Sequence, residues 1–269
     1  MLPIAILAGG LATRLRPVTE TIPKSLIQVA GRPFICHQLD YLRHQGINSV
    51  VLCIGYLGEM IQEVVGNGSQ WDMHVSYSPD GPALLGTGGA LRQALSLLGE
   101  HFFILYGDSY LPIDFSDVKK SYAASGKKGL MTVLKNQNRW DKSNVEFYAG
   151  QITEYNKTVI RPQMHYIDYG LGVLKSAVLQ AYPARQSFDL SKVYNDLSLA
   201  GELAGYEVFE RFYEIGSHQG IADTQAYLLK KQQRAVYELL KTTFEWSSWD
   251  HRKDGCGRNW KNGGFFGSS

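Results

Sequence analysis

The stretch PIAILAGGLATRLRP, residues 3–17, joins a short apolar run to a glycine-rich loop and then to two arginines. The run Pro3–Ala8 is apolar and contains branched side chains, which is typical of a buried β-strand. Gly9 and Gly10 follow it directly, and paired glycines let a backbone turn tightly and bring its N–H groups close to an anion. The stretch therefore predicts a strand whose carboxyl end carries an anion-binding loop.

Beyond this loop, apolar runs of strand length alternate with amphipathic runs of helix length. The expected strands are 3–8, 49–55, 74–78 and 101–106, and the expected helices are 33–45, 57–65 and 88–98. Such alternation predicts a parallel sheet with helices on both faces. Because ligands of these sheets bind beyond the carboxyl ends of the strands, we expect the chemistry in the loops after Ala8 and Tyr106.

The pattern changes near Gly129, where shorter apolar runs are separated by turn residues. The expected strands are 130–134, 144–148, 151–155 and 164–169, and the expected helices are 189–200 and 217–240. Without a flexible linker between the halves, residues 1–242 are expected to form one α/β domain, with a Rossmann-like, mostly parallel central sheet flanked by helices and a smaller β-rich lobe. The Trp- and Gly-rich residues 243–269 lack periodicity, which predicts an irregular, poorly ordered tail; the alternative is a tail that docks its aromatic side chains on a partner or on the body.

Composition argues against several classes of protein. The 269 residues carry 27 basic and 25 acidic side chains in no charged block, so neither nucleic acid nor a membrane surface is indicated as a partner. No run approaches the roughly 18 apolar residues of a membrane helix, and the N-terminus lacks the regions of a signal peptide, so we expect a cytoplasmic protein. Cys36, Cys53 and Cys256 form no CxxC pair, which predicts reduced thiols rather than a zinc site or disulfides.

The glycine-rich loop differs from two common nucleotide-binding loops. It lacks the third glycine of GxGxxG, and Lys24 follows a proline rather than the glycine of GxxxxGK[ST]. A dehydrogenase and a P-loop ATPase are therefore not indicated. Arg14, Arg16 and Lys24 could neutralise a polyphosphate, although an ordinary turn with solvated basic residues would have the same sequence pattern.

The segment LAGGLATRLRPVTETIPKSLIQVAGRPF, residues 7–34, resembles the signature of the sugar nucleotidyltransferases, the family of glucose 1-phosphate thymidylyltransferase and mannose 1-phosphate guanylyltransferase. Further pieces follow in the family's order: LGTGGAL at 85–91, LYGDS at 105–109, YNK at 155–157, DYG at 168–170 and YEIGS at 213–217. The resemblance covers residues 3–240. It implies an enzyme that joins a nucleoside triphosphate to a sugar 1-phosphate with Mg²⁺ as cofactor and releases pyrophosphate.

By this resemblance, the first loop binds the nucleotide through Leu7, Ala8, Gly9, Gly10, Thr13 and Arg14. Arg14 would hold the outer phosphates that leave as pyrophosphate, and Lys24 would contact the reacting phosphates, including that of the sugar. Such a transfer needs positive charge at the attacked α-phosphate and at the leaving group. Arg14 and Lys24 would supply this charge. By the same resemblance the expected catalytic residues are Arg14, Lys24 and Asp108.

Two carboxylates are the expected Mg²⁺ ligands. Asp108 follows the strand 101–106, and Mg²⁺ prefers carboxylate and phosphate oxygens. Glu214 stands where the family usually has a second metal-binding aspartate, so the resemblance makes it the second ligand. Each has a plainer alternative: Asp108 could cap a turn, and Glu214 could cap the helix that begins near Ser217 or face solvent.

The resemblance assigns three more residues to the base and the sugar. Gly88 in the LGTGGAL loop is expected beside the nucleobase, although this loop could equally be a helix entry capped by Thr87. Lys157 is expected on the sugar phosphate, while Asn156 replaces the glutamate that usually precedes this lysine. Gly170 is expected to leave space for the acceptor sugar, with a strand bulge as the alternative.

The resemblance is greatest to enzymes that use GTP and mannose or manno-heptose 1-phosphate, in the phrases GRPF at 31–34, IGYL at 54–57 and LYGDSYL at 105–111. A uridylyltransferase acting on an amino-sugar or muramate-type 1-phosphate is the close alternative, and either would supply cell-envelope polysaccharide synthesis. A catalytically silent regulatory relative is a third reading, but the catalytic residues that silent copies usually lose are present. The family also implies a homo-oligomer.

Overall fold

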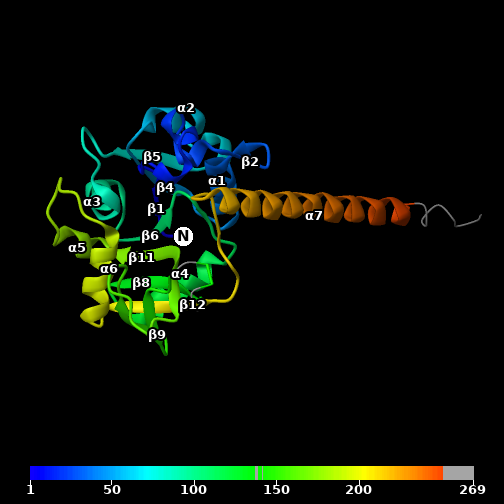
Figure 1. Ribbon diagram of the computed structural model, residues 1–269. Helices are drawn as coiled ribbons and strands as arrows, with labels where there is room; N and C mark the ends of the chain where they lie inside the picture. Colours follow the sequence, from blue (N-terminus) through cyan, green and yellow to red (C-terminus); the bar gives the residue numbers. More distant parts are fainter. Residues whose placement is uncertain (137–138, 141, 251–269) are drawn as a thin grey trace, which may run out of the picture. The chain divides into compact units, whose positions relative to one another are not determined.

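The structure is a computed structural model, and it describes residues 1–136, 139–140 and 142–250. The chain divides into two units, Met1–Gln225 and Ala226–Ser269. The first unit holds a nine-stranded sheet with helices packed on both faces (Figure 1). This architecture belongs to the α/β class that the sequence predicts.

The central sheet is mixed, in the order β5-β4-β1-β6-β11-β8-β12-β10-β9. Its strands are β1 (Ile4–Leu7), β4 (Ser49–Ile54), β5 (His74–Pro79), β6 (His101–Tyr106), β8 (Gly129–Lys135), β9 (Val145–Tyr148), β10 (Gln151–Tyr155), β11 (Tyr166–Lys175) and β12 (Leu203–Val208). The strands β5, β4, β1 and β6 are parallel, as their alternation with helices predicts. The sheet as a whole is less parallel than expected, because β11 lies antiparallel between β6 and β8, and β10 is antiparallel to both its neighbours.

Helices cover both faces of this sheet. α1 (Phe34–His44), α2 (Gly58–Val65) and α4 (Phe115–Ser125) pack on one face, and α3 (Gly86–Ala94), α5 (Ser176–Gln180) and α6 (Leu190–Leu199) pack on the other. Successive side chains of a strand point to opposite faces, so Ile4 and Ile6 of β1 join the first layer and Ala5 joins the second. Figure 1 shows α3, α5 and α6 along the same side of the sheet.

Short elements shape the loops around the sheet. They are the 3-10 turns η1 (Thr13–Leu15), η2 (Val18–Glu20), η3 (Lys24–Leu26), η4 (Ser69–Trp71) and η5 (Leu95–Leu97), and the strand pairs β2 (Gln28–Val29) with β3 (Arg32–Pro33) and β7 (Ser109–Tyr110) with β13 (Tyr213–Glu214). The pairing of β7 with β13 connects the loop after β6 to the residues that precede α7 (His218–Asp250). The pairing therefore brings together the motifs LYGDS at 105–109 and YEIGS at 213–217, which are far apart in the chain.

The C-terminal segment is helical where it is described. α7 continues to Asp250, so the beginning of the expected irregular tail is part of a helix, while residues 251–269 lie outside the described residues. None of the described helices has the length and apolarity that a membrane span requires. Cys36 and Cys53 are buried free thiols, as expected, and Cys256 lies outside the described part of the chain.

Candidate active site

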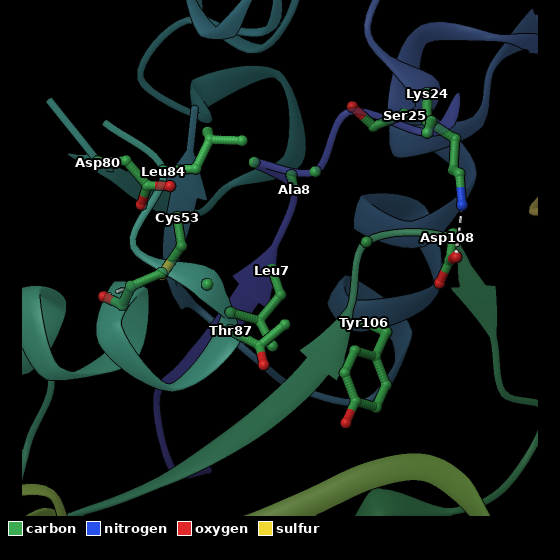
Figure 2. A pocket seen from close by; sticks show the side chains of 16 residues that line it. Leu7, Ala8, Lys24, Ser25, Cys53, Asp80, Leu84, Thr87, Tyr106 and Asp108 are labelled. Carbon is green, nitrogen blue, oxygen red and sulfur yellow. Dashed lines mark hydrogen bonds and ion pairs between the residues drawn. The ribbon is translucent and has the colours of Figure 1, made fainter. Parts of the chain in front are cut away.

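A cavity of about 250 Å³ opens at the carboxyl ends of β1, β4 and β6. Its walls come from the glycine-rich loop after β1, from η3, from the loop that leads into α3, and from the residues that end β6. Figure 2 shows Ala8 between two groups of side chains, with Asp80 and Leu84 on one side and Lys24 and Asp108 on the other. The cavity thus lies at both of the loops that the sequence singles out.

Glycines allow the strand ends to come close together beside the cavity. A Cβ atom on Gly107 would lie 2.6 Å from the carbonyl oxygen of Leu7, and one on Gly55 would lie 2.7 Å from that of Gly9. Both are approaches of backbone to backbone, so a larger residue would push the strand ends apart. Gly10 differs, because no atom lies within 4 Å of its Cβ position. Its backbone faces open space, where a ligand could approach it.

Lys24 and Asp108 form an ion pair at one end of the cavity. The Nζ atom of Lys24 donates to Oδ2 of Asp108 at 2.8 Å, and the two side chains are 18% and 30% exposed (Figure 2). Arg14 belongs to the same group, since its Nη2 atom and the Nζ atom of Lys24 each lie 3.3 Å from the Cβ position of Gly216. Two of the expected phosphate-binding side chains, from different loops, therefore converge on one point.

Glu214 joins this group because β13 pairs with β7. The N–H of Ile215 donates to the carbonyl oxygen of Asp108 at 3.0 Å, which brings Glu214 on β13 close to Asp108 in the turn just before β7. The Glu214 carboxylate accepts the Ser217 hydroxyl at 2.7 Å and the N–H of Gly216, at the N-terminus of α7. The Ser217 hydroxyl in turn accepts the N–H of Gly220 at 2.9 Å, so Ser217 caps α7 and the Glu214 carboxylate holds the capping hydroxyl beside the positive end of the helix dipole.

The two carboxylates fit a divalent cation unequally. Asp108 lies on the cavity wall, and its oxygens accept the Lys24 ammonium and the Ser109 hydroxyl, which leaves lone pairs for a metal. Both Glu214 oxygens already accept hydrogen bonds, from Gly216 and Ser217, so this residue is suited to acting through a water molecule. Among the residues that the structure describes, no group of three or more His, Cys, Asp or Glu side chains could hold a metal. A Mg²⁺ ion here would take its other ligands from phosphates and water.

The structure keeps Gly88 away from the cavity. Its Cβ position lies 2.3 Å from the ring of Phe188, and its N–H donates to the Phe188 carbonyl oxygen at 2.9 Å. This backbone group is therefore not free to contact a nucleobase, and Gly86 and Thr87 of the same loop line the cavity instead. Thr87 does not cap α3, since its hydroxyl accepts the N–H of Leu190 at 2.8 Å.

The remaining expected residues lie at the edges of the site. Thr13 is exposed in η1 and is not part of the cavity wall. Gly170 is buried in β11 with φ +111°, where the register with β8 shifts, and its Cβ position lies 3.6 Å from Leu111 and Ser109. It forms a strand bulge, as in the alternative reading, and does not line the cavity. Lys157 is an exposed side chain whose Nζ lies 3.6 Å from a carboxylate oxygen of Asp189.

Asp80 and Tyr106 line the cavity although the sequence reasoning assigned them no role. Burial raises the pKa of the half-buried Asp80 carboxyl above its usual value, against the effect of a hydrogen bond from the Leu85 N–H at 3.2 Å. Burial and the nearby Asp168 carboxylate raise the pKa of the Tyr106 phenol. Asp80 directly follows β5 and Tyr106 ends β6, so their position at strand ends was the signal that could have identified them.

The sequence model of the nucleotidyl transferase family matches residues 4–231, so the chain belongs to this family. The mannose-1-phosphate guanylyltransferase catalytic subunit beta of Danio rerio is 27% identical to it over 243 residues, which are 88% of this chain and 67% of the relative. The corresponding subunit of Xenopus tropicalis is 29% identical over 218 residues, 78% of this chain and 60% of the relative. The chain thus spans about 60% of the length of the second relative.

One further relative is similar to the chain over part of the sequence, and one solved structure is similar to it in fold. The N-acetylmuramate alpha-1-phosphate uridylyltransferase of Neisseria meningitidis is 40% identical over 112 residues, 41% of this chain and 48% of the relative. The crystal structure of HddC from Yersinia pseudotuberculosis complexed with GMP-PN superposes with a TM-score of 0.71 at 21% identity, covering 85% of this chain and 100% of that one. The chain therefore has the fold of a nucleotidyl transferase.

Proposed function

We propose that the chain is a sugar-1-phosphate nucleotidyltransferase that transfers the nucleotide of GTP to mannose or manno-heptose 1-phosphate and releases pyrophosphate. The observation that carries this proposal is the convergence of Arg14 with Lys24, which pairs with Asp108 on the wall of a cavity at the strand ends. Membership of the nucleotidyl transferase family supports the reaction type, and the guanylyltransferase relatives support the substrates.

The reaction is a direct, in-line displacement at the α-phosphorus. An oxygen of the sugar 1-phosphate forms a bond to this phosphorus while the bond to the bridging oxygen of pyrophosphate breaks. The attacking phosphate is already ionised at neutral pH, so the protein supplies neither a nucleophile nor a general base. Its contribution is to position the two anions and to neutralise the charge that builds between them and on the leaving group.

Each charged side chain of the cluster has a role in this displacement. Lys24 neutralises charge where the two reacting phosphates meet, and Arg14 holds the outer phosphates that leave together. Asp108 keeps the Lys24 ammonium in position through the 2.8 Å ion pair and would hold Mg²⁺, with Glu214 assisting through water. The metal supplies further charge neutralisation when it is bound.

Asp80 supports guanine as the base. Its carboxylate lies on the cavity wall opposite the phosphate-binding end and can accept hydrogen bonds in pairs. The N1–H and the exocyclic amino group of guanine are adjacent donors that match two carboxylate oxygens, whereas the single N–H of uracil lies between two carbonyl oxygens that repel a carboxylate. We expect Asp80→Asn to lower the preference for GTP over UTP, measured as the ratio of kcat/KM values, about 10- to 100-fold.

A uridylyltransferase acting on a muramate-type sugar is the second candidate. The uridylyltransferase relative from Neisseria meningitidis, 40% identical over 112 residues, favours it. In this case UTP would be the better substrate of the wild type, and Asp80→Asn would leave the ratio unchanged. A homo-oligomer and a cytoplasmic location stay predictions of the sequence.

The test is pyrophosphate release with Mg²⁺, using GTP, UTP, CTP and dTTP in combination with mannose, manno-heptose, glucose and N-acetylmuramate 1-phosphates. The proposal predicts release that needs both substrates, is greatest with GTP and a manno-configured sugar, and is lost in Asp108→Asn. The control is Asp117→Asn, an exposed carboxylate on α4 paired with Lys120, which should retain full activity. If no pair gives release while nucleotide still binds, the transferase proposal fails in favour of a silent regulatory protein.

A further inference from the structure

A buried amide on α1 contacts the turn that carries Asp108. Gln38 lies in the middle of α1 and is 2% exposed, and its helix neighbours Ile35 and Leu39 belong to the hydrophobic core. An amide side chain has two donors and an acceptor, and burying them among apolar groups costs free energy unless they are hydrogen-bonded. The partners of Gln38 therefore indicate why a polar side chain occupies this position.

The amide nitrogen of Gln38 holds the backbone at both ends of the turn between β6 and β7. Nε2 donates to the carbonyl oxygen of Tyr106 at 3.1 Å and to that of Ser109 at 2.8 Å. Tyr106 ends β6 and Ser109 begins β7, so Gly107 and Asp108 are the two residues between them. One side chain thus joins the two ends of the turn, from 68 and 71 positions away in the sequence.

The two carbonyl groups determine the orientation of the amide. Both are acceptors, so Nε2 must face them, because the opposite orientation would place Oε1 of Gln38 against two carbonyl oxygens. Within the described residues, Oε1 then has no hydrogen-bond partner. A buried acceptor without a partner costs about 1–3 kcal/mol, which offsets much of what the two hydrogen bonds contribute to stability. The orphaned oxygen therefore indicates a side chain that is kept for the turn rather than for the stability of the fold.

Two backbone contacts hold the same turn from other elements. The N–H of Gly107 donates to the carbonyl oxygen of Leu7 in β1 at 3.0 Å. The carbonyl oxygen of Asp108 accepts the N–H of Ile215, which directly follows β13, at 3.0 Å. Gln38 adds the contact with α1, so the backbone on both sides of the Asp108 side chain is fixed.

The position of this backbone decides where the Asp108 carboxylate lies. Its oxygens accept the Lys24 ammonium at 2.8 Å and the Ser109 hydroxyl at 3.2 Å, and the side chain is 30% exposed on the cavity wall (Figure 2). A partly exposed side chain is not held by packing alone, so a shift of the turn would move it. Groups that bind a cation or a reacting phosphate must be held within about 0.5 Å of the productive geometry.

We propose that Gln38 is a positioning residue of the reaction, whose amide holds the turn 106–109 so that the Asp108 carboxylate reaches both Lys24 and a divalent cation. This inference rests on the proposed function, from which it takes the role of Asp108. Gln38 does not line the cavity and touches neither substrate. Its substitution should therefore disturb the steps that depend on the cation and leave nucleotide binding without the cation nearly unchanged.

The first test is Gln38→Met, which keeps the length of the side chain and removes both donors and the unpaired oxygen. We expect the Mg²⁺ concentration for half-maximal pyrophosphate release to rise about 10-fold or more, and kcat to fall about 10- to 100-fold, as for other residues that orient metal ligands. The dissociation constant of GTP without Mg²⁺ should change less than about threefold. Gln38→Asn, whose amide is one methylene too short to reach both carbonyls, should behave alike and serves if Gln38→Met does not fold.

Gln45→Met is the matched control. Gln45 directly follows α1, and its side-chain oxygen accepts the N–H of Phe115 at the start of α4 at 2.8 Å. The same substitution thus removes a contact from the same helix to another element, away from the turn of Asp108. Gln45→Met should unfold at a lower temperature than the wild type and keep the wild-type kcat and Mg²⁺ requirement. A higher Mg²⁺ requirement in both variants would reduce the effect of Gln38 to general destabilisation and overturn the inference.

The sharper test is the gain in GTP affinity that Mg²⁺ provides, because it needs no turnover. The gain is the ratio of the GTP dissociation constants without and with Mg²⁺, measured by calorimetry. Gln38→Met and Asp108→Asn should each lower this ratio, and the double variant should match Asp108→Asn alone, because both changes act through one carboxylate. A wild-type ratio in Gln38→Met, or losses that add in full in the double variant, would overturn the inference.

These measurements separate the inference from the proposed function. If the wild type releases no pyrophosphate with any pair of substrates, but Gln38→Met and Asp108→Asn lose the same Mg²⁺-dependent gain in GTP affinity, the role of Gln38 stands and the transferase proposal fails. If the wild type is active and Gln38→Met keeps both its rate and its Mg²⁺ requirement, the transferase proposal stands and the role of Gln38 is rejected.

Discussion

Gly216→Ala places one methyl group where the charged side chains of the site converge. The new Cβ would lie 2.6 Å from Oε2 of Glu214 and 3.3 Å from nitrogens of both Arg14 and Lys24. Ordinary contact begins at 3.4 Å, so the Glu214 carboxylate must retreat by about 0.8 Å and the two cations by about 0.1 Å. All three are ends of flexible side chains, so the fold should survive at a cost of about 1–3 kcal/mol.

The catalytic cost of this substitution should be much larger than the cost in stability. Displacements approaching 1 Å in a positioned site lower rates by about 10²-fold, and we expect kcat/KM for nucleotidyl transfer to fall by that amount. The assay is steady-state pyrophosphate release together with thermal unfolding. Gly99→Ala is the matched control, because its nearest atoms lie at 3.8 Å and beyond, and it should remain fully active. A stable Gly216→Ala protein with wild-type kcat/KM would refute the argument that this cluster performs the reaction.

Three further predictions concern single side chains. Lys24→Ala should lower kcat by about 10²- to 10³-fold and weaken nucleotide binding far less, because its charge matters most in the transition state; single-turnover rates and binding titrations would test this. The pKa of the Asp168 carboxyl is higher in the folded protein than its ordinary value of about 3.9. Protonation of this carboxyl therefore stabilises the folded state fully below about pH 3.9, and this stabilisation is lost as the pH rises through the pKa of the folded state. Asp168→Asn should therefore unfold at a higher temperature than wild type at neutral pH and lose this advantage near pH 4, whereas a lower unfolding temperature at neutral pH would contradict the reasoning. Burial raises the pKa of the Cys53 thiol to about 12, so in a Cys256→Ser background Cys53 should react with thiol reagents after unfolding and not in the native protein, as mass spectrometry can measure.

Local patterns were sufficient to predict much of the first half of the fold. The sequences of β1, β4, β5 and β6 are apolar runs, and such runs indicate buried parallel strands because the side chains of these strands pack on both faces of the sheet. The same rule indicated the cavity, because the ends of these strands meet at one edge of the sheet. α4 was missed although its signal was present: Asp114 accepts the N–H of Ser116 as a helix cap, and Phe115, Val118 and Tyr122 recur at helical spacing on the buried face.

The features that were not predicted depend on contacts between distant residues. An apolar run does not reveal its direction, so the antiparallel insertion of β11 between β6 and β8 had no local signal. The orientation of Gly88 is determined by Phe188, which packs against it from another part of the chain. The position of Glu214 beside Asp108 had no local signal either, because it depends on the pairing of β13 with β7.

The most direct test of the central claim follows the α-phosphorus of the nucleotide. GTP labelled at this phosphorus would be incubated with the protein, Mg²⁺ and mannose or manno-heptose 1-phosphate, and the products separated. We predict that the label moves into a nucleotide sugar, that the transfer requires the sugar 1-phosphate, and that it falls at least 10²-fold in Lys24→Ala. Label that stays in GTP, or that appears in GMP or GDP regardless of the sugar, would contradict nucleotidyl transfer at the Arg14, Lys24 and Asp108 cluster.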